Sequence, residues 1–422
     1  MKTLSIRAIP ALFRVLVFFT PLVFAANTFE LFEFPKMYFV YIAGITIIWL
    51  FLITRIGGDK KVLWPGKVIL LFLLIYIVST VLSSHPYTSM WGYYKRFNGG
   101  LASVLVFVGL YVVAKNEFNR QQLKHLAEVA CLSLIPVSLY AIFQHYGIIT
   151  NIWGANVMER VTSTFGQPNW LAAYVVMLIP IILYRVLEAE NRVFWIILYS
   201  LAFVTLWLTY SLSGILGFVA GTAAFGYLNR ARLKTAIVPF AVLAAFSISF
   251  AFLNPGIFKG KLQDVFFDLK RIVQTHVQVY AQTESEQTEQ EYNVSDPGFI
   301  RFELWKGTVN LITSSTKTML IGTGPETFPY EFTKFRSPEI NYSSEWNFVI
   351  NKPHNYYLEL LSTIGFIGTF FYLLIISRSI LRKDKFFTPG LLALYATNIF
   401  GWPVVAPSLL FWLFLAGTEA KE

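Results

Sequence analysis

The sequence predicts an all-α polytopic membrane protein with about twelve transmembrane helices and one large extracytoplasmic loop that contains short amphipathic helices. The composition points to this fold class, because 55% of the residues are hydrophobic and only 14% are charged. Soluble domains carry about 25% charged residues. Aromatic residues make up 17% of the chain, which excludes an intrinsically disordered protein. A chain this poor in charge is expected to face lipid, where a helix is apolar on every side.

Apolar segments long enough to cross a bilayer as a helix recur along the chain, which is the second observation. No unit of about 20 to 50 residues repeats, so a solenoid or a propeller is not expected. The predicted spans cover residues 8–26, 37–54, 67–83, 100–114, 126–145, 168–187, 193–209, 211–228, 235–253, 355–377, 388–400 and 403–418.

The first apolar segment also has the outline of a secretory signal peptide, since a short basic lead precedes it and small residues follow it. Pro10 and Arg14 interrupt it, and the sequence that follows does not read as soluble. We therefore expect the first span to be retained. The single cysteine, Cys131, lies within a predicted span, which excludes an intrachain disulfide and a cysteine-based metal site.

Basic residues alternate between the loops and so predict the orientation of the chain. The N-terminus and five alternate loops hold eighteen Lys and Arg residues, whereas the opposite short loops hold four: Lys36, Lys95, Arg96 and Arg160. Short loops rich in Lys and Arg stay on the cytoplasmic side. The net charge of +10 thus reflects topology. No nucleic-acid partner is expected, because the charge is scattered over several loops.

This topology divides the chain into three parts: nine transmembrane helices in residues 1–253, a large extracytoplasmic loop in residues 254–354, and three transmembrane helices in residues 355–422. The acidic stretch 282–291 within the loop is expected to be solvated and flexible. Residues 299–313 repeat apolar side chains at near-helical spacing, so we expect an amphipathic helix on the membrane surface or against the bundle. The expected apolar face consists of Phe299, Phe302, Leu304, Trp305 and Val309.

Positively charged residues are scarce in the short loops of the predicted outer side, so each of them is a candidate for ligand binding. Arg96 lies among aromatic residues and glycines, and Arg160 precedes a segment in which Gln167 and Asn169 stand at the membrane face. Arg301 opens the predicted amphipathic helix. A single interfacial Arg often only snorkels or pairs with lipid phosphate. Several guanidinium groups on one side favour instead a bound phosphate, which they contact bidentately.

His354 stands at the start of the tenth predicted span, which begins at Asn355. The N-terminal end of a helix dipole disfavours imidazolium, so we expect a neutral side chain, as a general base must be. A structural histidine that only donates or accepts hydrogen bonds is the simpler alternative.

Glu359 lies five residues beyond His354 and is the only acidic residue placed well inside a predicted span. Intramembrane carboxylates are costly and usually face a polar interior. We expect Glu359 to be a structural partner of an Asn or Arg, with a contact to a sugar hydroxyl as the alternative. Further along the same span, the small residues Gly365 and Gly368 permit close helix packing.

Four segments together resemble the bacterial O-antigen ligase and O-antigen polymerase superfamily. They read WGYYKRFNGG (91–100), RVTSTFGQPNWLAAY (160–174), IGTGPETF (321–328) and HNYYLELLSTIGFIG (354–368). The His-Asn pair alone is moderately specific, whereas all four segments in this order are strong evidence for the resemblance.

The resemblance implies a multi-pass glycosyltransferase in the bacterial cytoplasmic (inner) membrane, with its active site facing the periplasm or the cell exterior. Its donor would be a glycan on undecaprenyl diphosphate. A hydroxyl of a glycan, lipid or protein acceptor would attack the anomeric carbon with inversion. No metal ion or other cofactor is implied, and membrane lipids are the remaining partner. The predicted site comprises the catalytic residues His354 and Arg301 and the substrate-binding residues Arg96, Arg160, Asn355, Glu359, Gln167 and Asn169.

One segment departs from the family pattern. Many relatives carry Ser-Arg-Gly after the seventh span, whereas residues 209–217 read TYSLSGILG and hold no arginine. Ligase and polymerase use nearly the same motifs, so the sequence leaves the acceptor, the sugar repeat and the oligomeric state open. A transporter or flippase for lipid-linked glycan is one alternative, although no inverted repeat supports it. A non-catalytic partner in polysaccharide assembly is the other.

Overall fold

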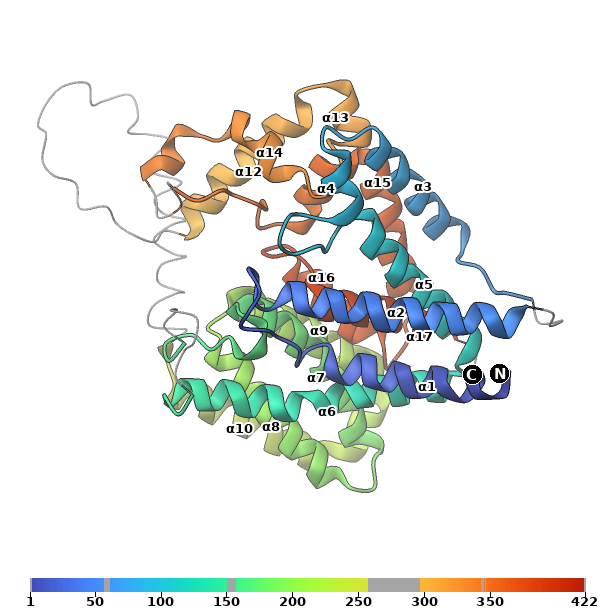
Figure 1. Ribbon diagram of the computed structural model, residues 1–422. Coiled ribbons are helices and arrows are strands. Elements are labelled where there is room, and N and C mark those ends of the chain that lie inside the picture. Colours follow the sequence, from blue (N-terminus) through green and yellow to red (C-terminus); the bar gives the residue numbers. More distant parts are fainter. Residues whose placement is uncertain are drawn as a thin grey trace, which may run out of the picture.

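The computed structural model describes residues 2–56, 61–149, 157–256, 297–342, 345 and 347–420. These residues form helices joined by short connections, and none of them lies in a strand (Figure 1). The bundle consists of α1 (Lys2–Phe19), α2 (Glu33–Arg55), α3 (Lys67–Val81), α5 (Leu101–Glu117), α6 (Arg120–His145), α7 (Pro168–Glu188), α8 (Arg192–Leu208), α9 (Leu212–Leu233), α10 (Ile237–Leu253), α15 (Tyr356–Leu381), α16 (Thr388–Thr397) and α17 (Val405–Glu419).

Shorter elements connect these helices or lie beside them. They are α4 (Pro86–Trp91), η1 (Ser163–Phe165), η2 (Lys234–Ala236), α12 (Pro297–Thr313), α13 (Thr316–Ile321), α14 (Phe328–Glu331), η4 (Phe332–Phe335) and η5 (Pro338–Tyr342). Residues 257–296 and with them the acidic stretch 282–291 lie outside the described residues.

Each predicted span coincides with one helix, so the all-helical fold class is confirmed. Among the described residues, five helices are long and apolar enough to cross a membrane by length and composition: α2, α6, α7, α9 and α15. Several other apolar helices, such as α3, α8, α10 and α17, are shorter. The number of twelve crossings therefore remains a prediction.

Helix α7 lies at the centre of the bundle. In its most apolar window, 89% of the residues are buried, and the helix packs against α6, α8, α9 and α16. A helix that is apolar all round is expected where neighbours surround it. Helix α2 is the opposite case, since only 28% of its window is buried. Its exposed Tyr38, Ile42, Ile45 and Trp49 follow a spacing of three or four residues and form an apolar outer face suited to lipid.

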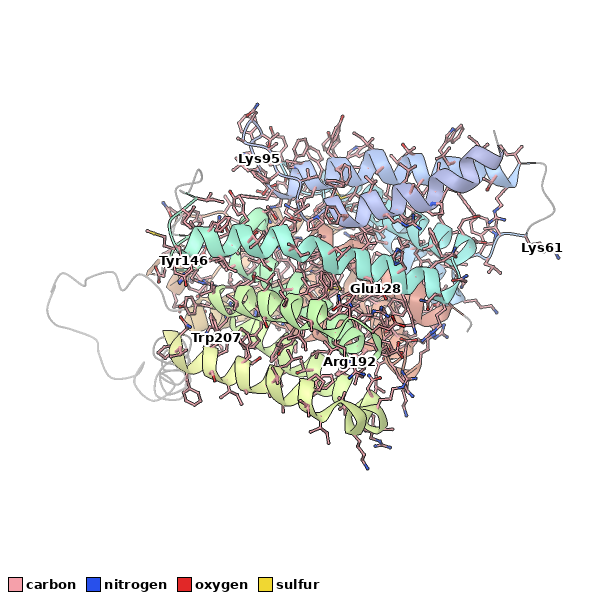
Figure 2. All side chains as sticks on the ribbon, turned by 90° about the horizontal axis from the view of Figure 1, so that it is seen from below. Lys61, Lys95, Glu128, Tyr146, Arg192 and Trp207 are labelled. Atoms are coloured by element: carbon pink, nitrogen blue, oxygen red, sulfur yellow. The ribbon has the colours of Figure 1, made fainter. Side chains whose placement is uncertain are left out.

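The connections gather at two opposite ends of the molecule. Figure 2 shows Lys95, Tyr146 and Trp207 at one end and Lys61 at the other. Both chain termini lie together at one end of the bundle (Figure 1). This arrangement agrees with the predicted alternation of outer and cytoplasmic loops. The end that holds Lys95 is called the outer end below, although its side of the membrane remains a prediction.

Lys36 does not lie in an outer loop, and the sequence-based placement is wrong for this residue. Helix α2 begins at Glu33, so Lys36 falls in its first turn and is fully buried. Its Nζ donates hydrogen bonds to the carbonyl oxygens of Thr164 at 2.7 Å and Phe32 at 3.2 Å. The ammonium group thus fastens the segment before α7 to the start of α2.

A helix is present over residues 299–313 as predicted, namely α12, but its buried face differs from the expected one. Ile300, Leu304 and Leu311 are buried in a small cluster of their own with residues of α14 and η4. Phe302 and Val309 are 38% and 48% exposed. The difference arises because α12 packs against α15 and η4 with one flank, which leaves the flank of Phe302 and Val309 uncovered.

Helix α15 is interrupted at Gly365, whose backbone is non-helical with φ 68° and ψ −177°. The interruption exposes carbonyl oxygens to the segment after α13. Ser362 O accepts a hydrogen bond from Thr323 N at 3.0 Å, and Thr363 O accepts one from Gly324 N at 2.9 Å. The outer segment is therefore anchored directly to the backbone of a bundle helix.

Glycine is required at the interruption because of both its backbone and its surroundings. A Cβ at Gly365 would collide with the backbone of Leu320 and Ile321 in α13. The predicted close packing is thus present at Gly365, although the partner is a short outer helix. At Gly368 the atoms nearest to a Cβ belong to Ile364 of the same helix.

Candidate functional site

His354 lies close to Arg96 and Arg301 at the outer end of the bundle. Burial of the imidazole, followed by the positive charges of Arg301 and Arg96, lowers the pKa of His354 from 6.5 to about 4. Like charges disfavour the protonated form, as does removal from water. The structure therefore brings together three predicted site residues from distant parts of the chain and keeps the imidazole neutral near pH 7.

Arg160 joins this group through Arg301. Burial and the charge of Arg301 lower the pKa of Arg160, while Glu159 opposes them. The Arg160 side chain donates to Thr209 O at 3.1 Å and to Asn169 Oδ1 at 3.5 Å. Thr209 opens the segment that lacks the family arginine. This segment contacts Arg160 through a backbone carbonyl.

Gln167 and Asn169 flank Pro168, the first residue of α7. Asn169 Oδ1 also accepts a hydrogen bond from Ser211 Oγ at 2.8 Å, so Asn169 links Arg160 to the start of α9. Gln167 Oε1 is buried and has no hydrogen-bond partner among the described residues. Because buried polar atoms are nearly always satisfied, this oxygen is available to a ligand.

Aromatic rings contact two of the arginines. The guanidinium carbon of Arg96 lies 5.2 Å from the ring centre of Trp170. That of Arg301 lies 5.8 Å from the ring centre of Phe400. Cation–π contacts of this kind hold the charge without neutralising it.

The turn between α16 and α17 supplies two site residues that the sequence analysis missed. The ring centre of Trp402 lies 5.2 Å from that of His354 and 6.1 Å from that of Trp170. Phe400 stacks on Trp305 with ring centres 6.1 Å apart. The only signal in the sequence was that this turn follows two predicted spans and so opens on the outer side.

The backbone around His354 is held in a strained conformation. His354 has a φ of 54°, in the left-handed region that non-glycine residues rarely adopt. Such a conformation costs about 1–3 kcal/mol and persists where neighbours enforce it. On one side, Pro353 O accepts a hydrogen bond from Trp305 Nε1 at 3.0 Å. On the other, Asn355 Oδ1 caps α15 by accepting from Tyr357 N and Leu358 N. Asn355, predicted to bind substrate, is thus a helix cap that also orients His354.

Lys352 is a third site residue that the sequence analysis missed. Its ammonium group forms buried ion pairs with Glu326 and Glu359. Burial works to lower the pKa of Lys352, but the two carboxylates outweigh it and raise the pKa, so the group stays charged. Glu359 is therefore a structural partner as predicted, although its partner is a lysine. A positive charge two residues before His354 was the available signal.

Glu326 reaches Lys352 from the segment that is anchored to α15. Its φ of 61° is a second left-handed non-glycine conformation at the site. Gly99 makes room for it, because a Cβ there would collide with the Glu326 carboxylate. Ser89 Oγ donates to Pro325 O at 2.9 Å and steadies the same turn. Three sequence segments of the family resemblance thus meet around one ion-paired cluster.

A cavity extends from this cluster into the bundle and encloses about 970 Å³, part of it open to solvent. Arg96 and Trp402 line the cavity, and both also lie beside His354. Its charged lining consists of Glu33, Arg96, Glu326, Lys352 and Glu359. Its deeper wall is apolar and includes Phe72, Phe107, Leu394, Phe411 and Trp412. Within the described residues, no group of three or more His, Cys, Asp or Glu side chains could hold a metal ion.

The comparisons with known proteins agree with the sequence resemblance. A family model described as O-antigen ligase matches residues 197–373, a stretch that contains Arg301, Glu326, Lys352 and His354. No curated protein matches the chain. The family match supports the O-antigen ligase and polymerase superfamily, and together with the apolar helices it indicates an integral membrane protein.

Proposed function

Starting from the match of residues 197–373 to O-antigen ligase, we propose that this chain is a membrane glycosyltransferase of that type. It transfers a glycan from undecaprenyl diphosphate to an acceptor hydroxyl, with inversion and without a metal ion. The observation that carries the proposal is the neutral imidazole of His354 beside the guanidinium groups of Arg96 and Arg301, with Arg160 next to Arg301.

The arginines account for recognition of the donor. Burial lowers the pKa of Arg301 and of Arg160, which means that their positive charges are poorly solvated. Several poorly solvated positive charges close together are unfavourable unless an anion binds to them. A diphosphate supplies that anion, and guanidinium forks bind its oxygens bidentately.

The proposed reaction is a single displacement. The acceptor oxygen forms a bond to the anomeric carbon while the bond from that carbon to the diphosphate oxygen breaks. The bonding electron pair leaves with undecaprenyl diphosphate, whose growing charge the arginines stabilise. His354 takes the proton of the acceptor hydroxyl. Because diphosphate is already a stable anion, no carboxylic acid is needed to protonate the leaving group, unlike in glycoside hydrolysis.

Donor binding also strengthens the proposed base. In the unliganded site the pKa of His354 is about 4, partly because of Arg301 and Arg96. A base with so low a pKa accepts a proton poorly. A bound diphosphate neutralises the two guanidinium groups and moves the pKa of His354 back toward its ordinary value. The imidazole is therefore a stronger base with the donor bound than in the unliganded site.

We place the reaction at the outer face of the cytoplasmic membrane of a bacterium. The distribution of Lys and Arg supports this placement, since most basic residues of the short loops lie at the end opposite the site. The acceptor is a hydroxyl of a glycan, lipid or protein, and both ligase and polymerase activity fit the same site.

The test is turnover by the purified chain of an undecaprenyl-diphosphate-linked glycan with candidate acceptors, followed by mass spectrometry of the products. His354→Ala and Arg301→Ala should each lower turnover by about 100-fold or more, as expected for loss of a general base or of a diphosphate contact. His145→Ala is the matched control, because His145 lies at the same end outside the site and bonds the backbone of Met158.

Full turnover in both variants would refute the assigned chemistry. If the wild-type chain moves the intact donor across vesicle membranes without cleaving it, the chain is a transporter.

A further inference from the structure

Arg96, Arg160 and Arg301 are called the arginine group below. The cavity behind Arg96 has a charge pattern different from that of this group. Three carboxylates line it, those of Glu33, Glu326 and Glu359, against the two basic side chains of Arg96 and Lys352. A diphosphate would gain less there than beside the arginines, because carboxylates accompany the basic side chains of the cavity. A neutral ligand rich in hydroxyl groups is not repelled. We propose that this cavity is a sugar-binding subsite, an inference that rests on the proposed glycosyltransferase function.

In each of two carboxylates, one oxygen has a hydrogen-bond or ion-pair partner and the other has none among the described residues. Glu33 Oε2 accepts a hydrogen bond from Val405 N at 2.8 Å, while Glu33 Oε1 is buried without a partner among the described residues. One oxygen of Glu359 binds Lys352, while Oε2 is likewise buried without a partner. Glu33 is 1% exposed and Glu359 5% exposed. Buried oxygens without partners are rare, because they lose the free energy of their hydrogen bonds to water.

A sugar ring would satisfy both carboxylates. Its hydroxyl groups donate to Glu33 Oε1 and Glu359 Oε2, which are fixed acceptors. Trp402 lines the same cavity and offers an aromatic face to the apolar side of the ring. Since Arg96 and Trp402 also lie beside His354, a sugar in the cavity lies next to a diphosphate held by the arginines. The sugar is either the reacting unit of the donor or the unit of the acceptor that carries the attacking hydroxyl.

The experiment measures dissociation constants of the purified full-length chain in detergent for three probes. The first is undecaprenyl diphosphate, and the second is undecaprenyl diphosphate that carries one N-acetylhexosamine. The third is the methyl glycoside of the same sugar, added to protein saturated with the first probe. The variants are Glu33→Gln and Glu359→Gln, which keep the side-chain shape. Thermal unfolding and gel filtration verify that each variant is folded.

A matched control is available at the opposite end of α2 from Glu33. Glu117 at the end of α5 forms an ion pair with Arg55 at the end of α2 and lies far from the cavity. Glu117→Gln should leave the binding of all three probes unchanged. Arg301→Ala should weaken the first probe, which tests the proposed diphosphate site independently of the cavity.

In the wild-type chain the sugar-bearing donor should bind about tenfold more tightly than undecaprenyl diphosphate, which is the scale of hydrogen bonds to a charged acceptor. Loss of that preference in Glu33→Gln and Glu359→Gln, with the first probe unaffected, supports the subsite and assigns it to the donor sugar. Weaker binding of the methyl glycoside alone supports the subsite and assigns it to the acceptor.

Two outcomes overturn the inference. Unchanged sugar-dependent binding in both variants would mean that the carboxylates do not contact the sugar. Equal weakening of undecaprenyl diphosphate with and without the sugar would assign the cavity, with its apolar deeper wall, to the lipid chain. Either result leaves the proposed function intact as long as Arg301→Ala still weakens the first probe.

Discussion

At the scale of single residues, the chemistry of the site is set by burial and by neighbouring charge. A histidine in water titrates near pH 6.5, and His354 is moved to about 4 by burial and by Arg301 and Arg96. Lys352 shows the reverse balance, because two carboxylates outweigh its burial and raise its pKa. The same low-dielectric surroundings thus keep one base neutral and one ammonium group charged.

The pH dependence of turnover tests this account of His354. The value of kcat/KM reports the free enzyme, so it should stay constant from about pH 8 to about pH 5 and fall toward pH 4 as the imidazole is protonated. In Arg301→Ala the fall should begin at higher pH, because removal of a positive charge raises the pKa of His354. The acid limb of kcat should also lie at higher pH than that of kcat/KM, since the bound diphosphate neutralises the arginines. An acid limb of kcat/KM that does not move in Arg301→Ala would contradict the assignment.

Removal of the Lys352 charge should destabilise the fold strongly. Lys352→Met leaves Glu326 and Glu359 buried without their cation, and breaking a buried ion pair in this way costs about 3–5 kcal/mol. Thermal unfolding in detergent should show a clear loss of stability. Lys306→Met on α12 is the control, because Lys306 is exposed and lies 3.7 Å from its carboxylate partner. Because the ammonium group of Lys306 is exposed to water, its ion pair with Glu303 should contribute less than about 1 kcal/mol. Equal melting temperatures of the two variants would refute a stabilising role for the ion pairs of Lys352.

At the scale of elements, interrupted and capped helices position the site. Helix α15 begins at the Asn355 cap directly after His354, and it is broken at Gly365, where the segment that carries Glu326 attaches. Helix α17 begins at Val405, whose N–H is bound by Glu33 of α2. Carboxylates are favourable at helix N-termini, so this contact also stabilises the entry of the chain into α17. His354 and the segment of Glu326 are therefore held in place by the start and the interruption of one helix.

Substitution of Gly365 should loosen the outer segment. Gly365→Ala requires a conformation that only glycine adopts readily and drives a Cβ into the backbone of α13. A loss of about 2 kcal/mol or more is expected. Gly226→Ala on α9 is the matched control, because a Cβ there meets nothing within 4 Å. In that helix, alanine should be neutral or stabilising by about 0.5–1 kcal/mol. Thermal unfolding compares the two variants, and a tolerant Gly365 would refute the role assigned to the interruption.

At the scale of the whole molecule, the two ends of the bundle differ in character. The outer end carries the arginine group and the mouth of the cavity. The opposite end carries basic loops, where acidic side chains neutralise part of the charge, as in the pairs Arg120–Asp384 and Lys115–Glu419. An apolar belt with exposed side chains such as those of α2 lies between the ends. Such a difference between the two ends is expected of a membrane protein, because short loops rich in Lys and Arg stay on the cytoplasmic side.

Labelling of single cysteines tests the orientation directly. Cys131 is buried and is replaced by serine to give a background without thiols. Lys95→Cys and Lys61→Cys then place one exposed thiol at each end of the molecule (Figure 2). In cells whose outer envelope is permeabilised but whose cytoplasmic membrane is intact, a membrane-impermeant maleimide should label position 95 but not position 61. Labelling should reach both positions after the membrane is disrupted, and the reverse pattern would refute the proposed outer location of the site.

The sequence by itself determined the helices and the main chemical groups of the site. Apolar length, the Asn355 cap and Pro168 at the start of α7 are local signals, and the expected helix over residues 299–313 is present as α12. His354 and Arg301 stand out in the sequence because each lies at the start of a predicted helix on the outer side. Local signals of this kind act within a few residues and can be read without knowing the fold.

Only the tertiary structure decided which distant groups meet. The pairing of Lys352 with Glu326 and Glu359, the contact of Glu33 with Val405, and the place of Trp402 beside His354 all join separate helices. The burial of Lys36 and the buried flank of α12 likewise depend on neighbours that are remote in sequence. Ion pairs and packing faces arise from how helices cross, and no periodicity within one helix encodes the angle at which another helix approaches.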